Sequence, residues 1–438
     1  MIKPLENWKN MLKFPNFLIG TCFLILLLLM LFLEEPIPSG VQLVFGLVFL
    51  LFLGGFFMYV FTPQIVDSVR DLLMTANRRI LPPLVVFIIF SIYRIIVPTS
   101  TDPFVTLFQI LVCFIFLLTP TFLYISFHKR IENGLSYIDV IAGLWVWLPI
   151  EFGVVDTMLG TVELGNLPFD TLLALFAFFY ALIFVRHHDM GLSFTISRED
   201  LMVVILAVGI LTLIIAPLGM LSYFLAPPAV IIENVMILFE EFPGSIVEII
   251  LTFLLIFLGT ALIEELFFRG FFFRLLEERF KQDTFSINWW YGGIAGLVGL
   301  IIITPWIDDI LQIFSWIPMV TPLQDIIGFL AEPLGDAEGQ AWPLVESIPL
   351  EALYLVASII LGLIAIIMIY KTKDPLIAAL VLSSILFGWA HFEDIRYIFF
   401  ASIAGFAYGW TYWKTQKIVP AALVHTTVNT IWGILFSF

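Results

Sequence analysis

The chain consists largely of apolar segments, most of them long enough to cross a lipid bilayer as a helix. A spanning helix needs roughly 20 apolar residues for a hydrocarbon core of about 30 Å, and on that criterion we expect about thirteen transmembrane helices. They cover residues 17–33, 41–61, 80–97, 104–127, 137–153, 169–185, 201–226, 245–273, 289–304, 352–370, 376–391, 396–413 and 419–436. With 61% hydrophobic and only 13% charged residues, the chain has more apolar surface than a water-soluble fold can bury. The sequence therefore predicts an all-α polytopic membrane protein.

The positions of Lys and Arg predict the orientation of these helices. With the N-terminus inside, 17 of the 20 basic residues fall on the cytoplasmic side, and the exceptions are Arg94, Arg269 and Arg396. The segment 305–351 has eight acidic residues and no basic one, so we expect it to be an external loop. An odd number of spans then places the C-terminus outside.

Composition also excludes some classes of function. The chain has no Lys/Arg-rich tract of the kind that binds nucleic acid. Its two cysteines, Cys22 and Cys113, lie in apolar runs without a CxxC partner, which argues against a disulfide framework or a thiolate metal site.

Three ionisable residues lie close together in one apolar helix. Glu264, Glu265 and Arg269 fall within six residues, and each charge at the middle of a bilayer costs on the order of 2.5–3.5 kcal/mol. Glu265 and Arg269 are four residues apart, so they share a helix face and neutralise each other. Glu264 points about 100° away from Glu265. We therefore predict that Glu264 is a carboxylate free to act as a general base.

Two histidines and one asparagine lie in or at the end of later apolar helices. His391 closes one of them, whereas His425 and Asn429 are four residues apart and project from one face of the last helix. Peptide hydrolysis needs a group that deprotonates water and donors that stabilise the oxyanion. A carboxylate, two imidazoles and an amide are suited to these tasks.

These residues occur as three short motifs in a fixed order. The motifs are Glu264-Glu265-x3-Arg269, Phe387-x3-His391 and His425-x3-Asn429, and the run 405–410 followed by Pro420-Ala421-Ala422 lies between the last two. In this order they resemble the CAAX protease and bacteriocin-processing (CPBP, or Abi) family of intramembrane proteases. The resemblance covers roughly residues 255–438.

The resemblance implies a membrane endopeptidase. Glu264 would activate water together with His391, and His425 with Asn429 would stabilise the oxyanion. Glu265 and Arg269 would hold the first site helix in place. The substrate would be a membrane-associated peptide or protein, in contact with membrane lipid, and the location would be the plasma membrane of a prokaryote.

The resemblance also implies a domain division. Residues 1–135 form N-terminal transmembrane helices, and residues 137–438 form the protease core. In contrast to the family pattern, 121 residues separate Arg269 from His391. An inserted helical hairpin with the acidic external loop, at about residues 288–373, accounts for this distance and keeps the motif helices in their orientation.

Helix lengths predict a difference in depth among the site residues. At about 1.5 Å per residue, Glu264 lies about 15 Å and His425 about 9 Å from the cytoplasmic ends of their helices. His391 lies about 24 Å from Pro375, the start of its helix, which is deeper than the other two.

Three alternatives remain open at this level. A transporter also carries intramembrane charges, although the polar residues here gather in the last 180 residues or so without an inverted pair of broken helices. A non-catalytic scaffold would keep the fold and lose the chemistry. Two imidazoles and a carboxylate are also ligands for a divalent metal such as zinc, but no HExxH helix is present, so the cofactor is left undetermined.

Overall fold

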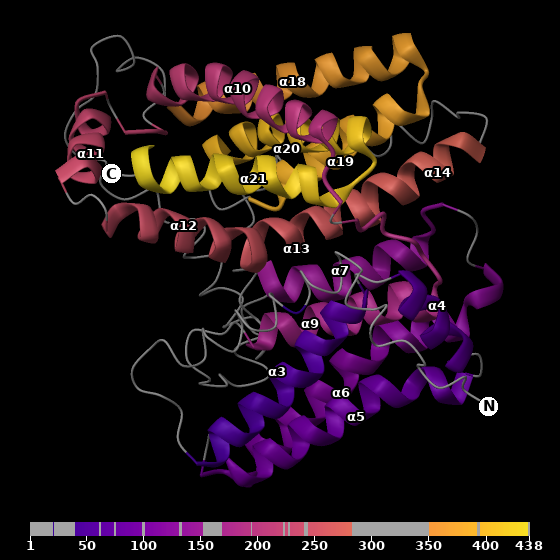
Figure 1. Cartoon of the computed structure of the whole chain (residues 1–438). Helices are drawn as coiled ribbons and strands as arrows, with labels where there is room; N and C mark the ends of the chain where they lie inside the picture. Colours follow the sequence, from indigo (N-terminus) through magenta and orange to yellow (C-terminus); the bar gives the residue numbers. More distant parts are fainter. Residues whose placement is uncertain are drawn as a thin grey trace. The chain divides into compact units, whose positions relative to one another are not determined.

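The computed structural model describes the chain in several stretches, and in all of them the regular structure is helical (Figure 1). The described residues are 21, 40–60, 63–73, 76–98, 101–130, 134–151, 169–193, 195–221, 224–226, 228–240, 244–282, 350–391 and 395–436. No strand occurs among them. The predicted all-α class is therefore confirmed for these stretches.

The chain divides into two compact units, residues 1–195 and residues 196–438. The sequence groups residues 137–195 with the protease core, whereas in the structure the helices of this stretch pack within the first unit. The extent of the core stays a prediction.

The first unit is built around one buried helix. This helix is α9 (Phe169–Tyr180), which continues through a π turn, η2 (Ala181–Val185), and every residue from 172 to 185 is buried. The helices α3, α6 and α7 pack around it, and α4 contacts η2. The bounds of the other helices are α3 Val41–Val60, α4 Pro63–Leu72, α5 Ala76–Ile96, α6 Pro103–Ser126, η1 His128–Arg130 and α7 Tyr137–Glu151.

The second unit is built around its last helix, α21 (Ile418–Ile431), which packs against α10, α12, α13 and α20. A single helical stretch from 244 to 282 contains α12, α13 and α14, with two π turns inside it (Figure 1). The bounds are α10 Arg198–Leu221, α11 Pro228–Glu240, α12 Gly244–Ile256, η3 Phe257–Ala261, α13 Leu262–Glu265, η4 Leu266–Phe273, α14 Arg274–Gln282, α18 Leu350–Thr372, α19 Pro375–Trp389, α20 Ile395–Thr415 and η6 Trp432–Phe436.

Five helices of the described stretches are long and apolar enough to cross a membrane. They are Arg78–Ile96, Pro103–Ser126, Arg198–Met220, Ile249–Gln282 and Ile418–Leu435. Shorter apolar helices occur at Leu43–Leu53, Tyr137–Ile150, Leu172–Val185, Ile360–Thr372 and Pro375–Trp389. The predicted span 289–304 and, except for residues 21, 350 and 351, the span 17–33 and the acidic loop 305–351 lie outside the described residues. The count of thirteen and the placement of the termini therefore remain predictions.

The helices α19 and α20 cross very closely because small residues face each other. A methyl group added at Gly388 would collide with Ser402 Oγ and would come within 2.6 Å of the Ile398 carbonyl oxygen. Gly405 is confined to a smaller degree, since its added Cβ would lie 3.0 Å from the Phe387 side chain. This crossing brings the backbone of α20 close to the residues of the predicted site.

Candidate active site

Glu264 and Glu265 lie on α13, a single α-helical turn between two π turns, η3 and η4. A π turn closes its hydrogen bonds from residue i to i+5, so it shifts the side chains that follow relative to a regular α-helix. Such turns are found frequently at functional sites. The two carboxylates differ in exposure, since the Glu264 side chain is 17% exposed and that of Glu265 is 0% exposed.

The predicted pair of Glu265 and Arg269 is present. Glu265 Oε2 lies 3.1 Å from Arg269 Nε, and both side chains are fully buried. Arg269 Nη2 also donates a hydrogen bond to the Gly405 carbonyl on α20. The guanidinium carbon lies 4.8 Å from the centre of the Phe387 ring, within the range of a cation–π contact. The cation therefore links the first site helix to α19 and α20.

His425 lies between the two glutamates. Its Nδ1 is 3.1 Å from Glu265 Oε1, and its Nε2 is 3.9 Å from Glu264 Oε2. Because a carboxylate accepts hydrogen bonds, we assign a proton to Nδ1, which leaves Nε2 facing Glu264. The sequence pattern missed this contact, since it assigned Glu265 to Arg269 alone and 160 residues separate the partners.

Two aromatic rings fix the imidazole of His425. The Tyr408 ring stacks on it at 4.5 Å between centroids with an interplanar angle of 14°. The Phe387 ring meets it edge to face at 5.4 Å. Tyr408 is buried, and it belongs to the run 405–410 that the sequence associated with the family. In the sequence, that run was the feature from which the presence of Tyr408 at the site could have been predicted.

His391 also contacts Phe387. Its ring centroid is 4.9 Å from that of Phe387, and its Nδ1 lies 2.9 Å from the Phe387 carbonyl oxygen. The two histidines therefore share one aromatic neighbour, and His425 contacts Glu264. The difference in depth predicted from helix lengths therefore does not separate His391 from His425, whereas the closeness of His391 to Glu264 stays a prediction.

Asn429 follows His425 by one helical turn on α21 and is partly exposed. Its side-chain amide makes no hydrogen bond to any other described residue. The structure thus joins Glu264, Glu265, Arg269 and His425 by direct contacts, connects His391 through Phe387, and gives Asn429 no such contact.

Several buried polar atoms of the site are not satisfied. Within the described stretches no hydrogen bond is made by Glu264 Oε2, Glu265 Oε2, or Arg269 Nε and Nη1. The 3.1 Å ion pair between Glu265 and Arg269 therefore has the distance of a hydrogen bond but not its alignment. Buried polar groups are normally hydrogen-bonded to protein atoms or to ordered water, so these four atoms keep the capacity to bind a water molecule or another partner.

A metal site is not formed by these side chains as they stand. Among the described residues no group of three or more His, Cys, Asp or Glu side chains has the arrangement of metal ligands. The donor types of Glu264, His391 and His425 nevertheless match a catalytic zinc set.

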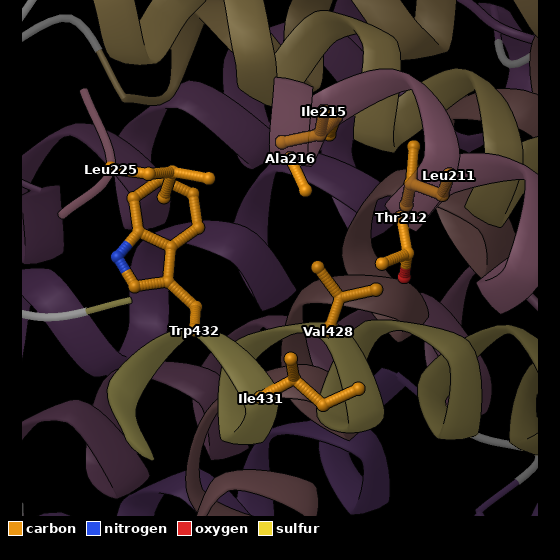
Figure 2. A pocket seen from close by; sticks show the side chains of 8 residues that line it. All are labelled: Leu211, Thr212, Ile215, Ala216, Leu225, Val428, Ile431 and Trp432. Atoms are coloured by element: carbon orange, nitrogen blue, oxygen red, sulfur yellow. The ribbon is translucent and has the colours of Figure 1, made fainter. Parts of the chain in front are cut away.

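An apolar pocket of about 30 Å³ lies between α10 and the last helix (Figure 2). A single water-sized group needs roughly 10–15 Å³, so the pocket has room for a small apolar group. Val428 and Trp432 line it, and Val428 is next to Asn429 in the chain. The Trp432 ring lies 5.8 Å from that of Tyr397, which in turn lies 4.5 Å from that of His391. The complete lining is Leu211, Thr212, Ile215, Ala216, Leu225, Val428, Ile431 and Trp432.

Comparison with known proteins identifies a family for this part of the chain. Residues 246–431 match the family model described as "Type II CAAX prenyl endopeptidase Rce1-like". No curated protein and no solved structure matches the chain. All six predicted site residues lie within the matched range.

Proposed function

Because residues 246–431 form a domain of the type II CAAX prenyl endopeptidase Rce1-like family, we propose that this integral membrane protein hydrolyses a peptide bond with a water molecule activated by Glu264. The family implies CAAX intramembrane protease activity. The assignment of each residue to a step is our proposal, and it is supported by the geometry around His425.

In the proposed reaction Glu264 takes a proton from water, and His391 helps to hold that water. The water oxygen forms a bond to the carbonyl carbon of the substrate, and the carbonyl oxygen becomes an oxyanion. The proton on Glu264 then passes to the amide nitrogen as the carbon–nitrogen bond breaks. Glu264 is thereby regenerated, and the products are a carboxylic acid and an amine.

His425 and Asn429 stabilise the oxyanion in this proposal. An imidazole donates from Nε2 only when that atom carries a proton, and Nδ1 already holds one toward Glu265. In this proposal the ring donates to the oxyanion from Nε2 while both of its nitrogens carry a proton, and the Glu265 carboxylate, 3.1 Å from Nδ1, accepts the other hydrogen bond. Glu265 therefore positions His425, in addition to pairing with Arg269. One oxyanion donor contributes about 2.7–4 kcal/mol.

One observation carries the proposal. A glutamate with an unsatisfied, buried oxygen lies 3.9 Å from an imidazole whose other nitrogen is fixed by a second, fully buried glutamate. A helix-packing cluster would satisfy its own polar atoms, since an unsatisfied buried group costs about 1–3 kcal/mol. A site that binds a water and a carbonyl leaves them available.

The substrate we propose is a peptide held at the membrane by an apolar group. The pocket between α10 and α21 accepts the end of such a group near the catalytic side chains. A prenylated C-terminal peptide is the first substrate to test, beside the same peptide without its lipid. The plasma membrane of a prokaryote, an inside N-terminus and a core that extends back to residue 137 belong to the same proposal.

Glu264→Gln tests the proposal directly. The amide keeps the size of the side chain but cannot accept the proton, so cleavage of a membrane-embedded peptide in proteoliposomes should fall by about 10²–10⁴-fold. The melting temperature should stay near that of the wild type. Glu278→Gln is the matched control, because Glu278 lies on the same continuous helix with a side chain that is 41% exposed. It should cleave at the wild-type rate.

The other outcomes identify the alternatives. Full activity of Glu264→Gln would end the protease proposal and favour a scaffold. Altered solute flux without proteolysis in any variant would favour a transporter. Loss of wild-type cleavage on chelation, restored by zinc, would add a metal to the site, whereas cleavage that resists chelation assigns the activation of water to Glu264 alone.

A further inference from the structure

A cluster of basic side chains lies in the first unit, which does not contain the candidate active site. Arg70 belongs to the last turn of α4, Arg79 to the first turn of α5, and His187 follows η2. Arg79 Nη2 lies 3.3 Å from His187 Nε2. Arg70 Nη2 donates to the His188 carbonyl at 3.1 Å. Both guanidinium groups therefore contact the same short segment, although they come from different helices.

The segment that carries His187 is held in an unusual backbone conformation. His187 has φ 61°, in the left-handed region that non-glycine residues rarely adopt. The amide of His188 donates to the Leu182 carbonyl at 3.1 Å, and Arg70 Nε donates to the Ile183 carbonyl at 3.0 Å. Such conformations persist only where the surroundings determine them, and they occur often at ligand-binding positions. The ring of His187 is exposed, so it is held in place at the surface.

Helix capping explains part of this arrangement. Arg79 Nε donates to the Leu73 carbonyl at 3.1 Å, and Arg78 Nη1 donates to the Leu72 carbonyl at 3.2 Å, so both arginines satisfy the end of α4. A guanidinium has five N–H donors, and these bonds use only some of them. Carbonyl groups are dipoles, so they satisfy donors but do not neutralise two or three positive charges.

Within the described stretches, the ion pair that these arginines form is an exposed one. The Asp67 carboxylate lies 3.4 Å from Arg70 Nη1, and the Asp67 side chain is 75% exposed. An exposed pair of this kind contributes about 0–1 kcal/mol. Arg78 and Arg79 lie at the N-terminal end of α5, where the helix dipole is also positive. The pKa of His187 is lowered, first by burial and then by the charges of Arg79 and Arg70, as expected in a positive field.

We propose that Arg79, Arg70 and His187 form a binding site for a phosphate group at the cytoplasmic surface of the membrane. Planar guanidinium groups bind phosphate oxygens in pairs, and a neighbouring imidazole supplies a further donor once it is protonated. The positive-inside pattern places Arg70 and Arg79 at the level where phospholipid headgroups lie. The phosphate is carried by an anionic phospholipid headgroup or by a soluble phosphate, and the experiment separates these two sources.

The test uses the full chain, purified in detergent, with native mass spectrometry and thermal unfolding as readouts. The ligands are phosphatidylglycerol, phosphatidylcholine and inorganic phosphate. Arg79→Gln should weaken phosphatidylglycerol binding at least tenfold. Arg79→Lys should retain only part of it, because it keeps the charge but loses the paired donors of the guanidinium group. Lys371→Gln is the matched control, since it removes an exposed cation from the end of α18 and should bind like the wild type.

Each outcome either overturns the proposal or identifies the source of the phosphate group. Binding of phosphatidylglycerol without binding of inorganic phosphate supports a lipid headgroup site, and the reverse supports a soluble phosphate. Equal binding by wild type and Arg79→Gln, or equal weakening in Lys371→Gln, overturns the proposal in favour of diffuse surface charge. If Arg79→Gln does not fold, His187→Asn takes its place, because asparagine tolerates the same backbone conformation and lacks the ring. Cleavage is not a readout, so failure here leaves the protease proposal untouched.

Discussion

Each of the two units contains a buried ion pair, and the two pairs are built in different ways. In the first unit Arg186 Nε lies 3.1 Å from Asp139 Oδ1, and the Asp139 side chain is fully buried. Asp139 Oδ2 accepts two further hydrogen bonds, from the amide of Ser136 at 2.8 Å and from its hydroxyl at 2.6 Å. Asp139 thus holds the start of α7 in place, and both of its carboxylate oxygens accept hydrogen bonds.

In the second unit the side chains of Glu265 and Arg269 are both fully buried, but they lie within a helix and keep unsatisfied atoms. The neighbouring Glu264 adds another unsatisfied oxygen. Burying a charge costs several kcal/mol even when it is paired, so neither pair is retained for stability alone. The fully bonded pair lies at a helix end, where it fixes local structure, whereas the incompletely satisfied pair lies where we propose that the substrate binds.

The largest effect on stability should follow from Arg269→Met. The substitution leaves the Glu265 carboxylate buried without its cation, and breaking such a pair costs about 3–5 kcal/mol. The double variant Glu265→Gln/Arg269→Met removes both charges, and its glutamine oxygen still accepts from His425. It should recover most of the stability but not the cleavage. Unfolding in a denaturing detergent measures the stability, and cleavage in proteoliposomes measures the activity. Arg269→Met with the stability of the wild type would contradict the comparison of the two ion pairs.

A smaller effect, confined to stability, should follow from Asp139→Asn in the first unit. The amide keeps part of the contact with Ser136 but loses the charged partner of Arg186, for a loss of about 1–3 kcal/mol. Cleavage per folded molecule should equal that of the wild type. Slow cleavage by correctly folded Asp139→Asn would show that this pair serves catalysis as well, which removes the contrast between the units.

The stacking of Tyr408 on His425 sharpens the comparison within the second unit. An aromatic pair contributes about 0.5–1.5 kcal/mol beyond its buried area, so Tyr408→Leu should slow turnover roughly two- to tenfold. Tyr408→Phe keeps the ring and should restore the rate, with KM unchanged in both variants. If Tyr408→Phe turns over as slowly as Tyr408→Leu, the hydroxyl group rather than the stacked ring is required.

The smallest expected effect is the contribution of His187, in the first unit, to the pH dependence of folding stability. Burial and the charges of Arg79 and Arg70 lower the pKa of His187 in the folded protein below its usual value of about 6.5. As the pH falls below about 6.5, the unfolded chain therefore takes up this proton first, and folding stability is lost until the folded-state pKa is passed. The wild-type melting temperature should fall more between pH 7.5 and 5.5 than that of His187→Asn. An equal fall in both proteins would remove His187 from the pH response.

The sequence by itself determined the helices and the local part of the site. Periodicity and apolar length predicted 104–127 and 169–185, and the structure has helical residues at Pro103–Ser126 and from Phe169 to Val185. The four-residue spacing of Glu265 and Arg269 predicted an ion pair, and the structure contains it. Such predictions succeed because a helix fixes the direction of side chains over three or four residues. The ordered motifs also predicted the family that residues 246–431 match.

Only the tertiary structure decided what surrounds His425. Its contact with Glu265, 160 residues away, depends on the packing of α21 against α13, and its stacking on Tyr408 depends on the packing of α20. The π turns on both sides of α13 leave no periodic signal in the sequence, yet they set the directions of the side chains that follow. A shift of one residue in any of these helices would turn the side chains by about 100°. Sequence spacing therefore predicted which side chains share a face of one helix. The register between packed helices decided which side chains of different helices come into contact.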